Sequence, residues 1–85
     1  MRYAVVFTNT AQRDLSRLQS AIMDRVETTV LSLEETPRPK GVKKLQGFKD
    51  YYRIRIGDYR IIYQINDAEN YAVIARILHR REAYR

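Results

Sequence analysis

Three arginines flank a two-residue turn signal near the middle of the chain. Arg53 and Arg55 alternate with apolar residues before Gly57-Asp58, and Arg60 follows it. A two-residue turn fixes the register of a β-hairpin, so Arg55 is predicted to lie directly opposite Arg60, with Arg53 close by. Guanidinium groups bind phosphate oxygens through paired hydrogen bonds and stay charged when partly desolvated. The cluster therefore indicates a polyanion lying across the strands. The alternative is a solvated face with splayed side chains.

Opposed like charges are costly for a sheet. Such a pair destabilises by a few tenths to about 1 kcal/mol, so selection for stability alone would favour Thr or Glu at one of the two positions. Arg76 and Arg80 share a parity on the last predicted strand. Their face depends on a register that the sequence leaves open. If it is the same face, five arginines converge there, with Arg81 near the rim.

Charge is distributed unevenly along the chain. Sixteen Lys and Arg against ten Asp and Glu give a net charge of +6. Residues 1–37 hold four basic and five acidic groups, whereas residues 38–85 hold twelve and five. The second half therefore generates the field that would attract an anion.

Length and composition exclude several classes of site. Eighty-five residues suffice for one small domain, residues 1–85. Cysteine is absent and histidine occurs once, which excludes disulfides, thiolate metal sites and a zinc site built by histidine alone. The first residues do not resemble a signal peptide, and no window approaches the ~20 apolar residues of a membrane span. We expect a soluble, cytoplasmic domain without metal or cofactor.

The first half predicts one strand and two helices. Residues 2–7 are β-rich. Thr8 or Asn9 is a candidate N-cap for a helix over Ala11–Gln19, and Ser20 is one for a helix over Ala21–Glu35. The second helix carries an apolar stripe that we assign to the core: Ile22, Val26, Val30 and Leu33. A segment containing two prolines ends it, and the two helices are expected to form an antiparallel hairpin.

The second half changes to a period of two. A basic connector over residues 40–50, with a short strand at Lys43–Leu45, leads into strands 51–56, 59–65 and 71–79 and a polar tail. Gly57 at the first central position indicates a type II′ turn. The predicted fold class is α+β, in the order β-α-α-β-β-β, with the helix hairpin packed on one face of a small antiparallel sheet. The residues predicted to face the helices are Ile54, Ile56, Tyr59, Ile61 and Tyr63.

These segments resemble the RelE toxins of the RelE/ParE toxin–antitoxin superfamily. The resemblance covers essentially the whole chain and is carried by KLQG at residues 44–47, YRIRIGDYRIIY at 52–63 and HRREAY at 79–84. It implies a toxin that cuts mRNA in the ribosomal A site without a metal, by attack of a 2′-hydroxyl on the adjacent phosphate. It also implies a cognate antitoxin as partner, with operator DNA reached only through that antitoxin. An acidic, partly disordered antitoxin would suit the net charge.

The resemblance also implies roles for individual residues. Arg53 and Arg55 stand where the best-studied members have lysines. Arg60 matches the arginine that stabilises charge on the scissile phosphate, Arg80 the proposed proton donor, and Tyr84 the tyrosine that stacks on a base. The candidate RNA- or ribosome-binding residues are Lys43, Lys44, Arg76 and Arg81.

The general base is the point of departure from the family. A lysine can lose its proton beside other cations, whereas arginine, with an ordinary pKa above about 12, stays protonated. Arg53 and Arg55 therefore act only electrostatically, or His79 or Lys44 takes the proton. His79 is a candidate general acid or base because histidine ordinarily titrates near neutrality, although a lone histidine is more often structural.

Two other functions remain open at this stage. A ParE-type toxin would share the fold and inhibit DNA gyrase, although ParE relatives generally lack the clustered arginines and the terminal tyrosine. A non-catalytic module could use the basic face to bind nucleic acid. Tyr84 is equally suited to base stacking and to packing of the tail.

Overall fold

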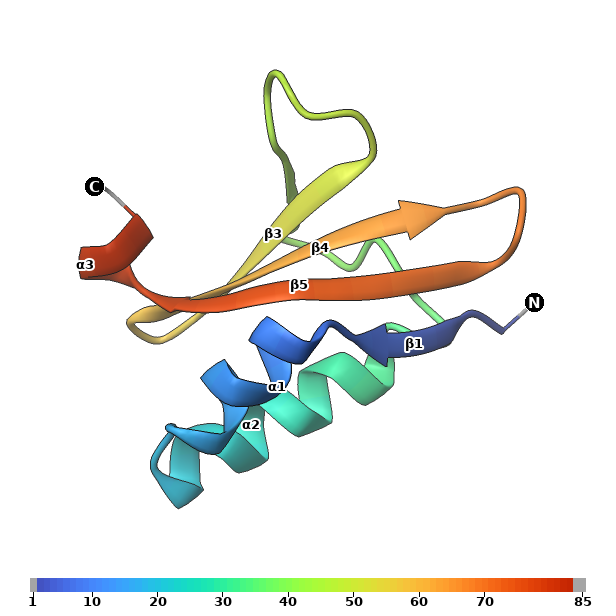
Figure 1. Cartoon of the computed structure of the whole chain (residues 1–85). Helices are drawn as coiled ribbons and strands as arrows, with labels where there is room; N and C mark the ends of the chain where they lie inside the picture. Colours follow the sequence, from blue (N-terminus) through green and yellow to red (C-terminus); the bar gives the residue numbers. More distant parts are fainter. Residues whose placement is uncertain (1, 84–85) are drawn as a thin grey trace.

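The protein has two layers, a twisted sheet and a pair of helices on one of its faces (Figure 1). The computed structural model describes residues 2–83. Its elements, in chain order, are β1 (Ala4–Phe7), α1 (Asn9–Ser16), α2 (Ser20–Ser32), β2 (Lys43–Lys44), β3 (Tyr51–Ile56), β4 (Tyr59–Asn66), β5 (Tyr71–His79) and α3 (Arg80–Ala83). This is the predicted α+β class, with one element, α3, where a polar tail was expected.

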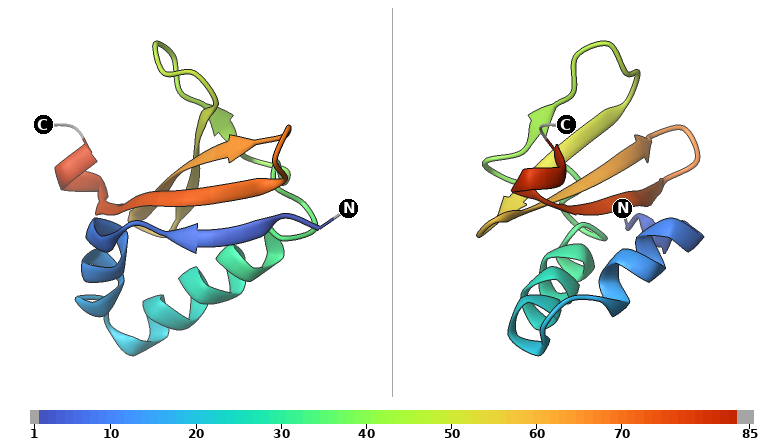
Figure 2. Two further views of the ribbon diagram at one scale, coloured as in Figure 1. Left: turned by 45° about the vertical axis from the view of Figure 1, so that its right-hand side comes forward. Right: turned by 60° about the vertical axis from the view of Figure 1, so that its left-hand side comes forward.

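The sheet has the strand order β1-β5-β4-β3-β2. Strands β2 to β5 pair in antiparallel fashion, as predicted. β1 instead pairs in parallel with β5, from Ala4 opposite Tyr71 to Phe7 opposite Ile74, so the expectation of a wholly antiparallel sheet is wrong at this edge. Parallel neighbours need a long connection. The helices carry the chain from β1 to the far edge, and the three later strands bring it back beside β1 (Figure 2).

The central hairpin has the predicted register. Ile54 lies opposite Ile61, Arg55 opposite Arg60 and Ile56 opposite Tyr59. Gly57 has a φ of 56°, which a glycine adopts without a steric penalty. Asp58 is not among the described non-glycine residues with positive φ, which are Asp50 and Asn70. Positive φ at the first central position alone is the type II′ geometry.

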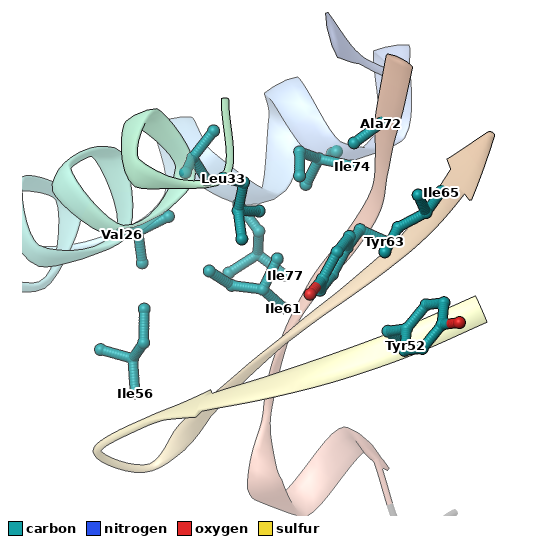
Figure 3. Packing of buried hydrophobic residues seen from close by; sticks show 12 residues of the cluster. Val26, Leu33, Tyr52, Ile56, Ile61, Tyr63, Ile65, Ala72, Ile74 and Ile77 are labelled. Atoms are coloured by element: carbon teal, nitrogen blue, oxygen red, sulfur yellow. The ribbon is translucent and has the colours of Figure 1, made fainter. Parts of the chain in front are cut away.

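The hydrophobic core fills the space between the sheet and the helices (Figure 3). From the sheet it takes the alternate residues of β4 and β5, and from α2 most of the predicted stripe: Ile61, Tyr63, Ile65, Ala72, Ile74, Ile77, Val26, Val30 and Leu33. Ile56 is also buried, whereas Ile22, Ile54 and Tyr59 are half-buried at the margin. One sheet face therefore belongs to the core, as the hairpin pattern predicts.

The helix boundaries differ slightly from the predicted ones. Thr8 is the N-cap of α1, and its hydroxyl accepts a hydrogen bond from the Ala11 N–H at 3.0 Å. The α-helix ends at Ser16 because the next two N–H groups bond three residues back, tightening the last turn. Ser20 lies inside α2 rather than capping it. Gln19 occupies the cap position without a side-chain hydrogen bond.

Asp14 completes the edge of the sheet where β1 ends. β5 continues beyond its last partner in β1, and a bulge at Ala75 shifts its register against β4. The Asp14 carboxylate accepts hydrogen bonds from the Ile77 N–H at 2.9 Å and from Arg76 Nε at 2.9 Å. Burial raises the pKa of this carboxyl, but these hydrogen bonds and the charges of Arg76 and Arg17 outweigh it, so its pKa is lowered. Asp14 thus takes the place of a further strand at this edge.

A second polar network closes the opposite end of the sheet. Arg38 binds Asp67 through two hydrogen bonds, of 3.1 and 2.8 Å, and its guanidinium lies 5.0 Å from the centre of the Tyr52 ring. Tyr3 donates to the same carboxylate at 2.7 Å. The hydrogen bonds from Arg38 and Tyr3 lower the pKa of Asp67 to about 2. The network ties the post-helix segment and the β4–β5 turn to the start of the chain.

We predict that Asp14→Ala destabilises the protein by about 2 kcal/mol, because it leaves the Ile77 N–H without its acceptor and removes the ion pair with Arg76. Urea unfolding followed by circular dichroism measures this loss. Asp24→Ala on the exposed side of α2 is the control, with an expected change within about 0.5 kcal/mol. Equal effects of the two substitutions would contradict the assignment of Asp14.

We also predict that Asp67 makes the protein acid-sensitive. Its folded-state pKa of about 2 lies below the ordinary value, so its contribution is complete above about pH 4 and is lost as the pH falls through the folded-state pKa. Asp67→Asn should therefore lose stability at pH 7 and show a smaller further loss between pH 5 and pH 2.5 than the wild type. Urea midpoints across this range test it, and parallel pH profiles would refute it.

Candidate active site

The arginine cluster lies on the sheet face opposite the helices. Because Arg55 pairs with Arg60 in the hairpin, their side chains project to the same side, and the pairing of Lys43 with Arg53 brings a fourth basic group alongside. The apolar residues that alternate with the arginines, Ile54, Ile56, Tyr59 and Ile61, belong to the core or pack against it. The sequence-derived register therefore places these side chains correctly.

Two adjacent hollows share Arg55 and Arg60. One, of about 380 Å³, lies between the β3–β4 turn and α3, and the other, of about 210 Å³, lies beside β2. Together they form the basic groove, which is lined by Lys43, Arg53, Arg55, Arg60, Arg80 and Arg81. Asp58 is the only carboxylate among the described residues that line it. The groove is thus strongly cationic, and its positive charges fit an anion that several side chains contact at once.

Arg60 is nearly inaccessible, although it lines both hollows. Only 2% of its surface is exposed. It lies on the central strand β4, flanked by Arg55 on β3 and Leu78 on β5. A guanidinium in this position has little contact with bulk water, and the reduced local dielectric strengthens its attraction for a bound anion. Arg60 is therefore the fixed cation of the groove, and the more exposed arginines surround it.

The short helix α3 brings two further arginines to the groove. The Arg80 N–H donates to the Asp58 carbonyl at 2.7 Å, which fixes the start of α3 on the β3–β4 turn. Arg80 Nη1 lies 3.8 Å from Asp58 Oδ1, with both side chains mostly exposed. The prediction that Arg80 continues the strand parity of Arg76 is wrong, because the strand ends at His79 and the chain turns. The turn nevertheless delivers Arg80 and Arg81 to the groove.

Two of the predicted RNA-binding residues lie elsewhere. Arg76 is opposite Ile62 in register, but its guanidinium pairs with Asp14 at 2.9 Å, at the α1 edge of the sheet. Lys44 pairs with Tyr52, a core residue, so it projects to the other side of β2 from Lys43. It lines a separate hollow around the following loop. The structure therefore gathers Lys43 and Arg81 at the groove and separates Arg76 and Lys44 from it.

His79 does not line the groove. Its ring packs edge to face against Tyr59, with centroids 5.1 Å apart, and its Nδ1 accepts a hydrogen bond from the Arg81 N–H at 3.2 Å. In the neutral ring this contact leaves the proton on Nε2. His79 therefore supports the start of α3, which favours the structural interpretation over a role as general base.

Other features bear on the choice of chemistry. Tyr84 lies outside the described residues. Within residues 2–83, no group of three or more His, Cys, Asp or Glu could hold a metal ion. In the same part of the chain, no helix is both long and apolar enough to cross a bilayer. From the sequence, Asp58 is assigned only to the turn. Its position between Arg55 and Arg60 already places a carboxylate within the arginine cluster.

Known proteins are similar to this chain in sequence and in fold. Residues 5–84 match the family described as "ParE toxin of type II toxin-antitoxin system, parDE". The chain is 36% identical to Toxin RelG of Mycobacterium tuberculosis over all of its own length and 99% of that protein. It is 29% identical to the mRNA interferase toxin RelE of Escherichia coli, over 79% of this chain and 72% of that one.

A solved structure agrees with these matches. The RelE–RelB complex of Pyrococcus horikoshii contains a chain that superposes with a TM-score of 0.84 at 33% identity, covering 94% of this chain and 97% of that one. The sequence match, the fold and the cationic sheet face thus coincide along nearly the whole chain. The chain therefore belongs to the RelE/ParE superfamily of type II toxin–antitoxin systems, and within it to the RelE-type toxins.

Proposed function

We propose that the basic groove cleaves RNA, and that the protein is a ribosome-dependent endoribonuclease that cuts mRNA in the ribosomal A site and thereby inhibits translation. The observation that carries this proposal is the convergence of five arginines on the two hollows of the sheet face that share Arg55 and Arg60. The name of the E. coli relative, an mRNA interferase, supports the same activity. Since its substrate is translated mRNA, the protein acts in the cytoplasm.

The proposed reaction is a transesterification at one phosphate of the RNA chain. The 2′-oxygen of a ribose attacks the adjacent phosphorus, its proton passes to solvent, and the bond to the 5′-oxygen breaks. The products are a 2′,3′-cyclic phosphate and a 5′-hydroxyl, once the leaving oxygen has taken up a proton. Negative charge accumulates on the non-bridging oxygens, and preorganised donors stabilise it best. Arg60 occupies the fixed central position for this role, with Arg55 and Arg53 beside it.

The structure supports catalysis by charge rather than by Lys44 or His79 as a general base. Lys44 lies on the other side of β2, and the Nδ1 of His79 is engaged by Arg81. The arginines of the groove keep their protons. Their positive field instead makes the 2′-hydroxyl easier to deprotonate by solvent, since nearby cations favour the anionic form.

Positioning must then come from outside the groove. In-line attack requires the 2′-oxygen, the phosphorus and the leaving oxygen to be aligned, and orientation of this kind contributes several kcal/mol to catalysis. The groove is lined mainly by long arginine and lysine side chains. We assign the alignment of the mRNA to the ribosome. Arg80 is suited to contact the leaving oxygen, and stacking by Tyr84 stays a prediction.

An antitoxin completes the proposed system. The related toxin of P. horikoshii is seen in a RelE–RelB complex. We propose that this chain likewise binds a cognate antitoxin that neutralises it, and reaches operator DNA only through that protein. The net charge of +6 favours an acidic partner.

We predict that Arg60→Ala and Arg80→Ala each lower mRNA cleavage by about 100- to 1000-fold, because each removes a donor from the developing charge. The assay is cell-free translation of a defined mRNA followed by primer extension, with and without ribosomes. Arg60→Lys tests geometry, since lysine keeps the charge without the planar pair of donors. Arg13→Ala, exposed on α1, is the charge-matched control.

Three results would contradict this proposal. Full cleavage by the Arg60 and Arg80 variants would remove the assigned site. Intact mRNA together with inhibited DNA supercoiling would identify a ParE-type gyrase inhibitor. RNA binding without new 3′ ends would indicate a non-catalytic module. Circular dichroism of each variant separates lost activity from lost folding, which matters most for the buried Arg60.

We further predict that the single-turnover cleavage rate rises about tenfold per pH unit between pH 5.5 and pH 7.5, because the reacting 2′-hydroxyl loses its proton to solvent. His79→Gln should leave this slope unchanged. Rates measured on programmed ribosomes at saturating toxin test the prediction. A plateau near neutrality that disappears in His79→Gln would instead identify His79 as the general base.

A further inference from the structure

The loop between β2 and β3 forms a second exposed feature. Residues 45–50 project beyond the body of the domain, away from α1 and α2 (Figures 1 and 2). The loop is held at both ends, since the Leu45 N–H donates to the Tyr51 carbonyl at 2.9 Å and the Ile65 N–H to the Asp50 carbonyl at 3.0 Å. Gly47 and Asp50 adopt positive φ. The loop therefore has a defined shape that presents its tip to solvent.

An aromatic ring and one lysine occupy this loop, and a second lysine, Lys44, precedes it at the end of β2. Phe48 is 63% exposed, and its ring contacts Tyr51 edge to face at 6.2 Å. Phe48, Lys44 and Lys49 line a hollow of about 570 Å³ at the loop. A single exposed apolar side chain needs no explanation on most proteins. An exposed aromatic side chain that lines one hollow together with two cations is a more specific arrangement.

Another exposed apolar residue shows the contrast. Leu31 on α2 is 64% exposed, but it lies in a hollow with Glu27 and Glu34. Two carboxylates line its hollow, of which Glu34 also pairs with Arg2, whereas two lysines and no carboxylate are among the described residues that line the hollow of Phe48. Bases stack on aromatic rings without regard to sequence, and adjacent cations hold the backbone phosphates. The loop thus combines the two elements of a site for unpaired RNA.

We propose that the 45–50 loop is a second RNA-binding site, in which Phe48 stacks on an unpaired base and Lys44 and Lys49 contact the flanking phosphates. β2 links it to the basic groove, because Lys43 lines the groove and Lys44 lines the hollow of the loop. The inference rests on the proposed function for its biological ligand, which is RNA of the ribosome. It explains how the toxin docks without using the cleavage residues.

The test compares binding by the full-length wild type, Phe48→Ala, Phe48→Trp and Leu31→Ala. Two probes are used: ribosomes whose A-site codon carries 2′-deoxyriboses and resists cleavage, and a fluorescent single-stranded oligoribonucleotide. Phe48→Ala should weaken binding to both by about five- to 100-fold, the effect of one lost stacking contact. Phe48→Trp should restore it, and Leu31→Ala should match the wild type.

A second arm tests the cations. Lys49→Gln should reduce the slope of log affinity against log salt by about 0.7 on the oligoribonucleotide, as expected for one lost phosphate contact. An unchanged slope would remove Lys49 from the site.

The outcomes separate this inference from the proposed function. Wild-type affinity of Phe48→Ala for both probes would overturn the loop site. Weaker binding to the antitoxin with unchanged binding to RNA would assign the loop to that protein and also overturn it. If the wild type binds the oligoribonucleotide but not ribosomes, the proposed function fails, and the Phe48 comparison on the oligoribonucleotide still decides the loop site. If the wild type binds neither probe, both proposals fall.

Discussion

The Gly57-Asp58 turn is the constraint on which the rest of the structure depends. It sets the β3–β4 register, so one residue of slippage would exchange the faces of Ile56 and Arg55. It therefore decides at once that the apolar residues meet the helices and that the arginines meet each other. The carbonyl of Asp58 also receives the first N–H of α3. The same turn thus positions two parts of the basic groove, the sheet face and α3.

The cationic face must be stabilised by the remainder of the domain. Arg55 and Arg60 repel each other on adjacent strands, and Arg60 is buried as well. The opposite face of the same strands carries Ile61 and Tyr63, both fully buried, and the hydrophobic effect there offsets the repulsion. Polar networks around Asp14 and Asp67 hold the two ends of the sheet. The cost of this face for folding is consistent with the proposed role of its arginines in binding phosphate.

The sequence predicts the parts of the site that depend on local geometry. Alternation and a glycine turn are enough to place Arg53, Arg55 and Arg60 together. The position of Arg76 could not be predicted, because it depends on the bulge at Ala75 and on an acid 62 residues away. Likewise, the parallel pairing of β1 with β5 could not be predicted, because the two strands lie far apart in the sequence. The burial of Arg60 could not be predicted either, because β4 is central only once β5 pairs with it, which alternation within one strand does not show.

The position of the cations also accounts for the proposed dependence on the ribosome. The groove offers charge, but the two residues considered as general base, His79 and Lys44, are not among the described residues that line it. Electrostatic stabilisation acts on any phosphate that is already aligned, and it does little for one that is not. RNA in solution samples in-line geometry rarely, so a groove of this kind is a poor nuclease alone. On this proposal, the same charges become effective when the ribosome holds the codon in an aligned conformation, and cleavage is then confined to mRNA under translation.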